Sequence, residues 1–88
     1  QNIDIGAIRH AASDIQGIIN MHHLQIWARS TSENALTAHL LLDNNVDIAT
    51  EQRLKQELRQ RLLKINIHHI TLETERVSQP CIDCDCVE

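Results

Sequence analysis

The sequence predicts an α+β domain in which two helices lie on one face of a three-stranded sheet. Apolar residues recur at three- and four-residue steps in two segments, which is the helical period, and alternate in three others, which is the strand period. These segments follow one another in the order α-β-β-α-β. A chain of 88 residues has room for one such domain. A domain of this size buries roughly 60–65% of its unfolded surface, so we expect marginal stability without a ligand or a partner subunit.

The first helix is expected from about Asp4 to Gln16. Asp4 is a suitable N-cap, because its carboxylate can accept hydrogen bonds from the free backbone N–H groups of the first turn. Gly17 stands where a left-handed residue commonly ends a helix. The apolar stripe of this helix comprises Ile5, Ile8, Ala12 and Ile15.

Two strands are expected next, over residues 19–29 and 35–43, joined by a polar turn over residues 30–34. In the first strand, one face carries Leu24, Ile26 and Ala28, and the other carries His23, Gln25 and Trp27. In the second strand, one face carries Leu36, Ala38, Leu40 and Leu42, and the other carries Thr37, His39 and Leu41. Their closeness in sequence predicts an antiparallel hairpin.

A second helix is expected over residues 48–63, with Asp47 as its N-cap. Its apolar stripe comprises Ile48, Leu54, Leu58 and Leu62. The last strand is expected from about His69 to Arg76. One of its faces carries Ile70 and Leu72, and the other carries Thr71, Glu73 and Glu75.

If both helices cover the same face of the sheet, the opposite face is left open. That open face would mix Trp and Leu with His and Glu, which is typical of a contact surface or a ligand site. Trp27, the only aromatic residue other than histidine, suits either an anchor for a partner or local packing against Leu41.

The bulk properties exclude several classes of function. The formal net charge is −4 and there is no basic stripe, so we expect no nucleic-acid partner. The sequence has no G-x-S-x-G, no H-E-x-x-H and no glycine-rich phosphate loop, so we do not expect an enzyme. The longest strongly apolar stretch, around residues 40–42, is far short of the roughly 20 residues that a membrane-spanning helix needs. Because the chain begins with Gln1, we expect it to be a piece of a longer protein.

Three cysteines, Cys81, Cys84 and Cys86, lie within six residues of one another. Thiolates are preferred ligands of zinc and of softer ions such as cadmium, and the C-x-x-C spacing lets two sulfur atoms reach one ion. Asp83 and Asp85 add negative charge beside them. We interpret the cluster as metal-binding; the alternative is a tail of idle, reduced thiols.

His22, His39 and Glu75 form a second candidate set, since imidazole nitrogens and a carboxylate are standard zinc ligands. On spacing alone, ordinary hydrogen-bonded histidines are the favoured interpretation. His68 and His69 are adjacent in a strand and therefore point to opposite faces, so they are not expected to chelate one ion.

Three segments together resemble the C-terminal domain of the cation diffusion facilitators. They are INMHHLQIW at residues 19–27, NALTAHL at residues 34–40 and IHHITLETE at residues 67–75. The resemblance implies the ferredoxin-like, metallochaperone-like fold of that family, with a mixed sheet. It also implies a homodimer on the cytoplasmic face of a membrane, attached to a transmembrane exporter that exchanges divalent metal for protons.

The resemblance assigns residues 1–76 to the regulatory domain and leaves residues 77–88 as a cysteine-containing tail. It implies metal ligands at His22, His39 and Glu75, with Cys81 and Cys84 joining the site; it gives no place to Cys86. Zinc is the expected ion, and cadmium, cobalt and nickel remain open. The sequence departs from the family where a second histidine is frequent, at Gln25, and offers only Glu51 and Gln52 where some members carry a ligand on the second helix.

The function implied is that of a metal-sensing and dimerisation domain, in which bound metal favours the closed dimer and transport. Two other hypotheses remain open at this point. One is a freestanding metallochaperone or metal buffer that uses the cysteines. The other is a small-molecule-binding domain, or an enzyme, built on the same fold.

Overall fold

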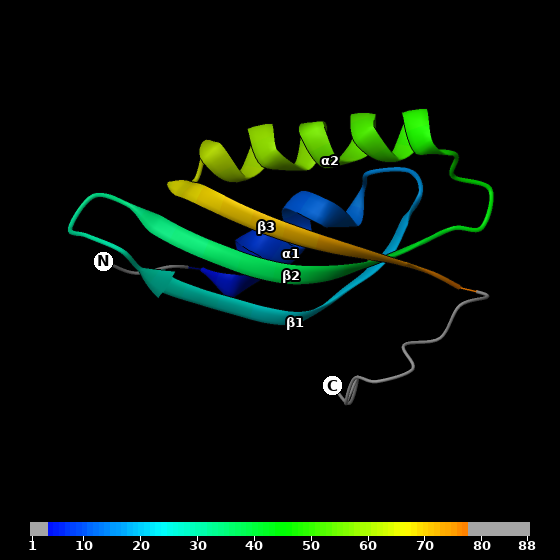
Figure 1. Cartoon of the computed structure of the whole chain (residues 1–88). Helices are drawn as coiled ribbons and strands as arrows, with labels where there is room; N and C mark the ends of the chain where they lie inside the picture. The colour runs from blue at the N-terminus through cyan, green and yellow to red at the C-terminus, as the bar shows by residue number, and fades with distance from the viewer. Residues whose placement is uncertain (1–3, 78–88) are drawn as a thin grey trace.

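The computed structural model describes residues 4–77, which form five elements in the order α-β-β-α-β (Figure 1). The elements are α1 (Ile5–Ser13), β1 (Ile18–Ala28), β2 (Asn34–Leu42), α2 (Ile48–Leu63) and β3 (Ile67–Arg76). The predicted α+β class, element order and approximate bounds are therefore confirmed. The last strand begins at Ile67, two residues before the expected start, and Ile67 is fully buried.

The three strands form one mixed sheet in the spatial order β1-β2-β3. β1 and β2 are antiparallel, as the hairpin prediction requires, and β2 and β3 are parallel. A parallel pairing needs a crossover connection, and α2 supplies it. The central strand β2 thus lies between β1, which precedes it in the sequence, and β3, which follows it. This arrangement brings residues near positions 22, 39 and 75 into one region.

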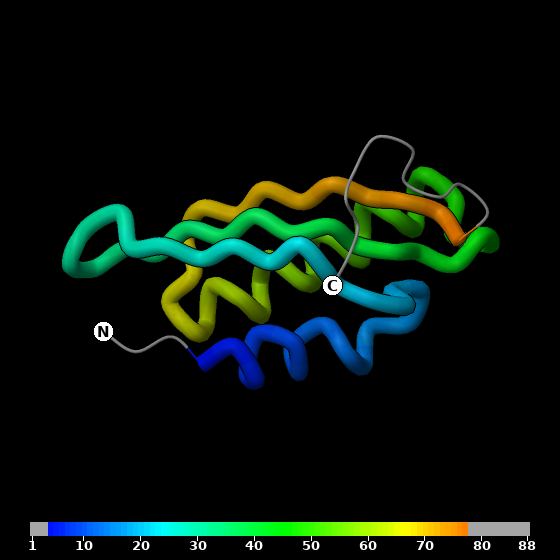
Figure 2. Tube along the Cα trace, turned by 90° about the horizontal axis from the view of Figure 1, so that it is seen from below, coloured from blue at the N-terminus to red at the C-terminus, as the bar shows by residue number. Residues whose placement is uncertain are grey.

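Both helices pack on one face of the sheet, and the core lies between them and β2 (Figures 1 and 2). Every second side chain of β2 points into this core and is almost completely buried: Leu36, Ala38, Leu40 and Leu42. The helices contribute the side chains that cover them: Ile8, Ala12, Leu54, Leu58 and Leu62. The predicted burial is therefore confirmed for this face of β2 and for these five residues of the helices.

The helix ends follow the predicted capping. The Asp4 carboxylate accepts from the backbone N–H of Ala7 at 3.3 Å, and that of Asp47 accepts from Thr50 at 2.7 Å. α1 ends at Ser13, earlier than expected, and the chain turns into β1 through Gly17 at a φ of 104°. That backbone angle suits glycine because it has no Cβ.

Two residues of the predicted apolar stripes are exposed instead. Ile5 and Ile48 are each the first residue of their helix and keep 52% and 76% of their surface. Ile48 lies six residues before Leu54, about 240° around the helix axis, so it cannot share the face of Leu54 and Leu58. Glu51, three residues before Leu54, does share that face.

The suggested packing of Trp27 against Leu41 is wrong. Trp27 pairs with Ala35 near one end of the sheet, whereas Leu41 pairs with Asn20 near the other. Six residues along β2 separate the two positions, about 20 Å in a strand. Trp27 is 46% exposed, at the hairpin end of the sheet.

Neither α1 nor α2 has the length and apolar character needed to cross a membrane, and no other helix occurs within residues 4–77.

Candidate metal centre

The three residues of the second candidate set come together on the open face of the sheet. His22 and His39 are register partners across the β1–β2 pairing. Glu75 of β3 reaches both: its Oε1 atom lies 3.1 Å from Nε2 of His22, and its Oε2 atom lies 2.8 Å from Nδ1 of His39. One carboxylate thus holds two imidazoles from the two other strands.

A β-bulge in β1 makes this arrangement possible. The regular pairing breaks between His22 and Gln25, and His23 within the bulge has a φ of 52°. Strict alternation would place His22 and Gln25 on opposite faces. The inserted residue reverses the alternation, so that both lie on the face of His39.

The bulge also brings His23 to the site, which the sequence interpretation did not include. The ring centroids of His23 and His39 are 4.8 Å apart, and those of His23 and His22 are 5.1 Å apart. Nitrogen atoms of the three imidazoles all lie within 4.8 Å of one another. Adjacent histidines at the expected position of the first ligand were a visible signal, but regular alternation assigned them to opposite faces.

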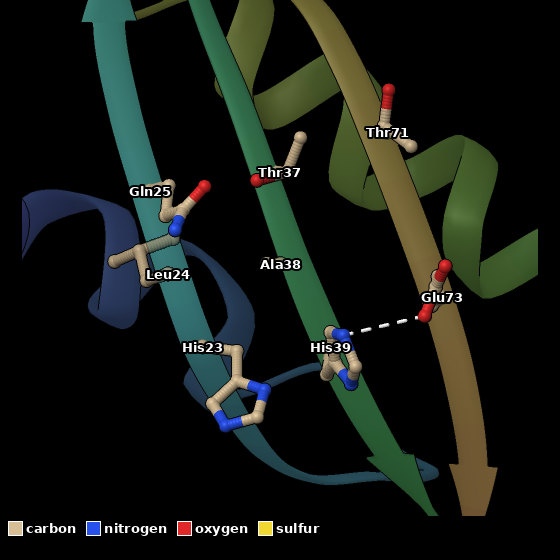
Figure 3. Close-up of a pocket in the computed structure, with 8 residues that line it drawn as sticks. All are labelled: His23, Leu24, Gln25, Thr37, Ala38, His39, Thr71 and Glu73. Carbon is tan, nitrogen blue, oxygen red and sulfur yellow. Dashed lines mark ion pairs between the residues drawn. The ribbon is translucent and has the colours of Figure 1, made fainter. Parts of the chain in front are cut away.

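A hollow of about 540 Å³ opens beside these rings, and Figure 3 shows it from the open face. Its lining comes from all three strands: His23, Leu24, Gln25, Thr37, Ala38, His39, Thr71 and Glu73. Glu73 projects from β3, and its Oε1 atom lies 3.3 Å from Nε2 of His39. The Glu73 side chain is 71% exposed, whereas that of Glu75 is 15% exposed.

The electrostatics of Glu75 favour its charged form. Burial acts to raise the pKa of this carboxyl, but the hydrogen bond from His39 and the charge and hydrogen bond of His22 outweigh it. The pKa of Glu75 is therefore lowered from its ordinary value, and the group is an anion at neutral pH. An anionic oxygen beside three imidazoles is a donor set suited to a divalent cation.

The donor geometry fits a single ion after small side-chain movements. Zinc binds imidazole nitrogen at about 2.0–2.1 Å, so two nitrogens on one ion are at most roughly 4 Å apart. In a tetrahedral site such nitrogens are about 3.3 Å apart. Those of His22, His23 and His39 lie within 4.8 Å of one another, which leaves at most about 1.5 Å to close. Glu75 can contribute once it releases a hydrogen bond, and its position between two imidazoles already orients them.

The other candidate ligands lie elsewhere. Cys81, Cys84 and Cys86 fall outside residues 4–77, the part of the chain that the structure describes. Gln25 lines the hollow. Glu51 packs on the opposite, helix-covered side of the sheet, where its Oε1 atom lies 2.8 Å from Nη2 of Arg76.

His68 and His69 point to different surroundings, as expected from their adjacency. His69 contacts Arg29 and Glu33 at the hairpin end of the sheet, at 2.8 Å and 3.1 Å. His68 borders a hollow that is also lined by residues of α2.

The fold is shared with the C-terminal domains of known metal transporters. The chain superposes on the metal-bound C-terminal domain of the CzcD transporter from Cupriavidus metallidurans with a TM-score of 0.73 at 30% identity, covering 83% of this chain and 99% of that one. The equivalent domain of CzcD from Thermotoga maritima shares the fold, with a TM-score of 0.75 at 17% identity, over 85% of this chain and 88% of that one.

The sequence places the chain in a family. Residues 1–77 match the family model described as "cation efflux protein, cytoplasmic domain". The chain belongs to this family, and the resemblance to the cation diffusion facilitators is confirmed.

Curated relatives are much longer than this chain. A cadmium, cobalt and zinc/H(+)-K(+) antiporter of Bacillus subtilis is 29% identical over 75 residues, which is 85% of this chain and 24% of the relative. The proton-coupled zinc antiporter SLC30A2 of Homo sapiens is 25% identical over 88 residues, which is 100% of this chain and 23% of the relative. The chain thus spans about a quarter of the length of these relatives.

Proposed function

We propose that this chain is the metal-sensing and dimerisation domain of a proton-coupled exporter of divalent metal. The observation that carries the proposal is the meeting of His22, His39 and Glu75 on one face, within the 2.8–3.1 Å contacts described above. Zinc is the proposed ion, because imidazole and carboxylate groups make a standard zinc set. Cadmium and cobalt are the next candidates, because both appear beside zinc in the name of the Bacillus antiporter, and nickel follows them.

His22, His39 and Glu75 are the proposed core ligands, and His23 is added to them from its place in the bulge. Cys81, Cys84 and Cys86 are proposed to supply soft donors to the same ion or to a second one. The thiolates would favour cadmium over harder ions. Bound metal would supply positive charge beside Glu73 and Glu75, and would fix the relative positions of the three strands.

The proposed regulation follows from charge and mass action. Each chain carries a formal net charge of −4, so two copies repel one another when they approach. A cation bound on the open face offsets part of that charge. If the ion binds the closed dimer more tightly than the open one, it shifts the equilibrium toward the closed form and toward transport.

A freestanding metallochaperone or buffer is the alternative. The lengths of the curated relatives count against it, because this domain accounts for only 23–24% of the Bacillus and human transporters. An enzyme or a small-molecule receptor on the same fold is also disfavoured, because membership of the cation efflux family accounts for the donor set without either.

The test is a zinc titration of the reduced 88-residue chain, with heat of binding and mass by light scattering followed together. We expect tight binding that also promotes a dimer, and weaker binding in His39→Ala and in Cys84→Ser. The proposal fails if there is no binding below roughly millimolar zinc, where the free energy of binding is only about −4 kcal/mol.

A further inference from the structure

Glu51 is an acidic residue on the buried face of α2, a position where a charged side chain is unusual. It lies in the first turn of α2 and shares the face of Leu54 and Leu58, so its side chain points at the sheet. The side chain is only 15% exposed. Carboxylates are seldom placed so unless they are paired and hydrogen-bonded.

Both oxygen atoms of Glu51 are used by β3. Oε1 accepts from Nη2 of Arg76 at 2.8 Å, and Oε2 accepts from the Thr74 hydroxyl at 2.9 Å. Arg76 also donates to the backbone carbonyl of Val46, just before α2, at 3.2 Å. We call these contacts of Glu51 with Thr74 and Arg76, together with the contact of Arg76 with Val46, the α2–β3 clamp.

The clamp holds the residue on each side of Glu75. Side chains alternate along a strand, so Thr74 and Arg76 point toward α2 while Glu75 points to the open face. Glu75 lies one residue before the end of β3, and the ends of strands are where pairing is most easily lost. Because the Glu51 carboxylate accepts hydrogen bonds from both Thr74 and Arg76, it restrains the backbone of Glu75 from the helix-covered side of the sheet.

Alternatives for holding this end of β3 are few among residues 4–77. The backbone pairing of β3 with β2 continues through Arg76, and the N–H of Val77 donates to the carbonyl of Leu42 at 3.3 Å. In the part of the chain that the structure describes, β3 has a neighbouring strand on one side only. The side-chain clamp therefore adds the restraint that a second neighbouring strand would otherwise provide.

We infer that Glu51 is a positioning residue for the metal centre: through Thr74 and Arg76 it sets the place of the Glu75 carboxylate between His22 and His39. This inference rests on the proposed function. The pKa of Glu51 is lowered by its hydrogen bond with Arg76, so its charge is retained at neutral pH. Glu51 lies on the far side of the sheet from the imidazoles and does not itself bind the ion.

Removal of the charge tests the inference, with the 88-residue chain and zinc alone as probe. Glu51→Gln should weaken zinc binding about tenfold, the lower end of the loss seen when outer-shell partners of metal ligands are removed. Glu57→Gln is the matched control, because Glu57 is on the same helix and pairs with Arg61 at 2.6 Å in an exposed ion pair. It should bind zinc as the unaltered chain does.

A double-mutant cycle separates positioning from general stability. If Glu51 acts through Glu75, Glu51→Gln should cause no further loss of affinity in a Glu75→Gln background. Equal losses in both backgrounds would overturn the inference. The absorption spectrum of bound cobalt should also change in Glu51→Gln and stay the same in Glu57→Gln.

Thr74→Val provides a second route should Glu51→Gln fold poorly. It removes one hydroxyl contact from the clamp and keeps a β-branched side chain suited to a strand. We expect a smaller loss of zinc affinity that again vanishes in the Glu75→Gln background. Zinc affinity unchanged in both Glu51→Gln and Thr74→Val would overturn the inference alone, whereas an unaltered chain that does not bind zinc would overturn the proposed function with it.

Discussion

The Nδ1 atom of His39 lies 2.8 Å from the Oε2 atom of Glu75, across the parallel pairing of β2 with β3. The register partner of Glu75 is Leu41, two residues beyond His39, so the contact is a diagonal one. Each side chain restricts the rotamers of the other. An ion bound at the proposed site would find two donors already side by side, and would replace one hydrogen bond rather than order two free side chains.

The first prediction concerns His39 as a ligand. Replacement of a ligand should cost at least as much as loss of an outer-shell partner, so we expect His39→Ala to weaken zinc binding about hundredfold or more in calorimetry. His10→Ala is the control, because His10 is exposed on α1 and distant from the open face in the fold. Equal affinities of the two variants would remove His39 from the site.

The second prediction separates the chemistry of His23 from its backbone. Asn tolerates the left-handed region, so His23→Asn should weaken zinc binding and leave the free energy of unfolding nearly unchanged. A β-branched residue does not tolerate a φ of 52° well, so His23→Val should in addition lose about 1–2 kcal/mol of stability. Urea denaturation without metal measures the second effect. A His23→Asn variant that binds zinc normally would show that the third imidazole is dispensable.

The third prediction tests the core beneath the site. Leu58 is 0% exposed, so Leu58→Ala should lower the free energy of unfolding by about 2–5 kcal/mol. Leu63 is on the same helix and 48% exposed, and Leu63→Ala should change stability by no more than about 0.5 kcal/mol. Both are compared at one protein concentration, because association would stabilise the fold. Similar losses in the two variants would contradict the placement of α2.

The fourth prediction concerns the turn between α1 and β1. Residue 17 has a φ of 104°, which residues with a Cβ rarely adopt. A Cβ at this position would also lie 3.1 Å from both Leu54 Cδ2 and Val46 Cγ2. Gly17→Ala should therefore destabilise the fold by about 1 kcal/mol or more in thermal unfolding. Gly6→Ala is the comparison: Gly6 is in the first turn of α1 without a positive φ, and a Cβ there would meet only the end of the Asp4 side chain, at 3.1 Å, which can shift. The turn is wrongly described if Gly17→Ala is the milder change.

The fifth prediction is a pH dependence from Glu51. Its folded-state pKa is lowered by Arg76, so its contribution to stability is complete above the unfolded pKa, near 4.5, and is lost as the pH falls through the folded pKa. The stability difference between the unaltered chain and Glu51→Gln should thus be constant near neutral pH and shrink below about pH 4.5. A difference that grows on acidification would contradict the ion pair. Chemical denaturation over pH 3–7 measures it.

Most of the fold followed from local patterns, because each element has a strong one. Leu36, Leu40 and Leu42 alternate strictly, and Asp4 and Asp47 cap the helices that they were expected to cap. The first residues of the helices were harder to place. Ile5 and Ile48 look like core by type alone, and only the packing shows that nothing covers them.

The site was less predictable than the fold for one physical reason. Alternation from Leu24, Ile26 and Ala28 assigns His22 to a face only if β1 is regular, and the bulge at His23 reverses that assignment halfway along the strand. Residues 22–25 contain no glycine, so the local sequence pattern does not predict a bulge there. Residue type suggested His22, His39 and Glu75 and family resemblance favoured them, whereas the roles of His23 and of the clamp residue Glu51 emerge only from three-dimensional contacts.

The crossover through α2 also sets an order of events during folding. His22 and His39 lie on one hairpin, so the pairing of two neighbouring strands is enough to bring them together. Glu75 is 53 positions after His22, and joins them only when α2 has packed and β3 has paired with β2. A chain in which β3 has not yet paired therefore lacks the Glu75 carboxylate on this face, and a metal site built on all three residues would be complete only in the fully paired sheet.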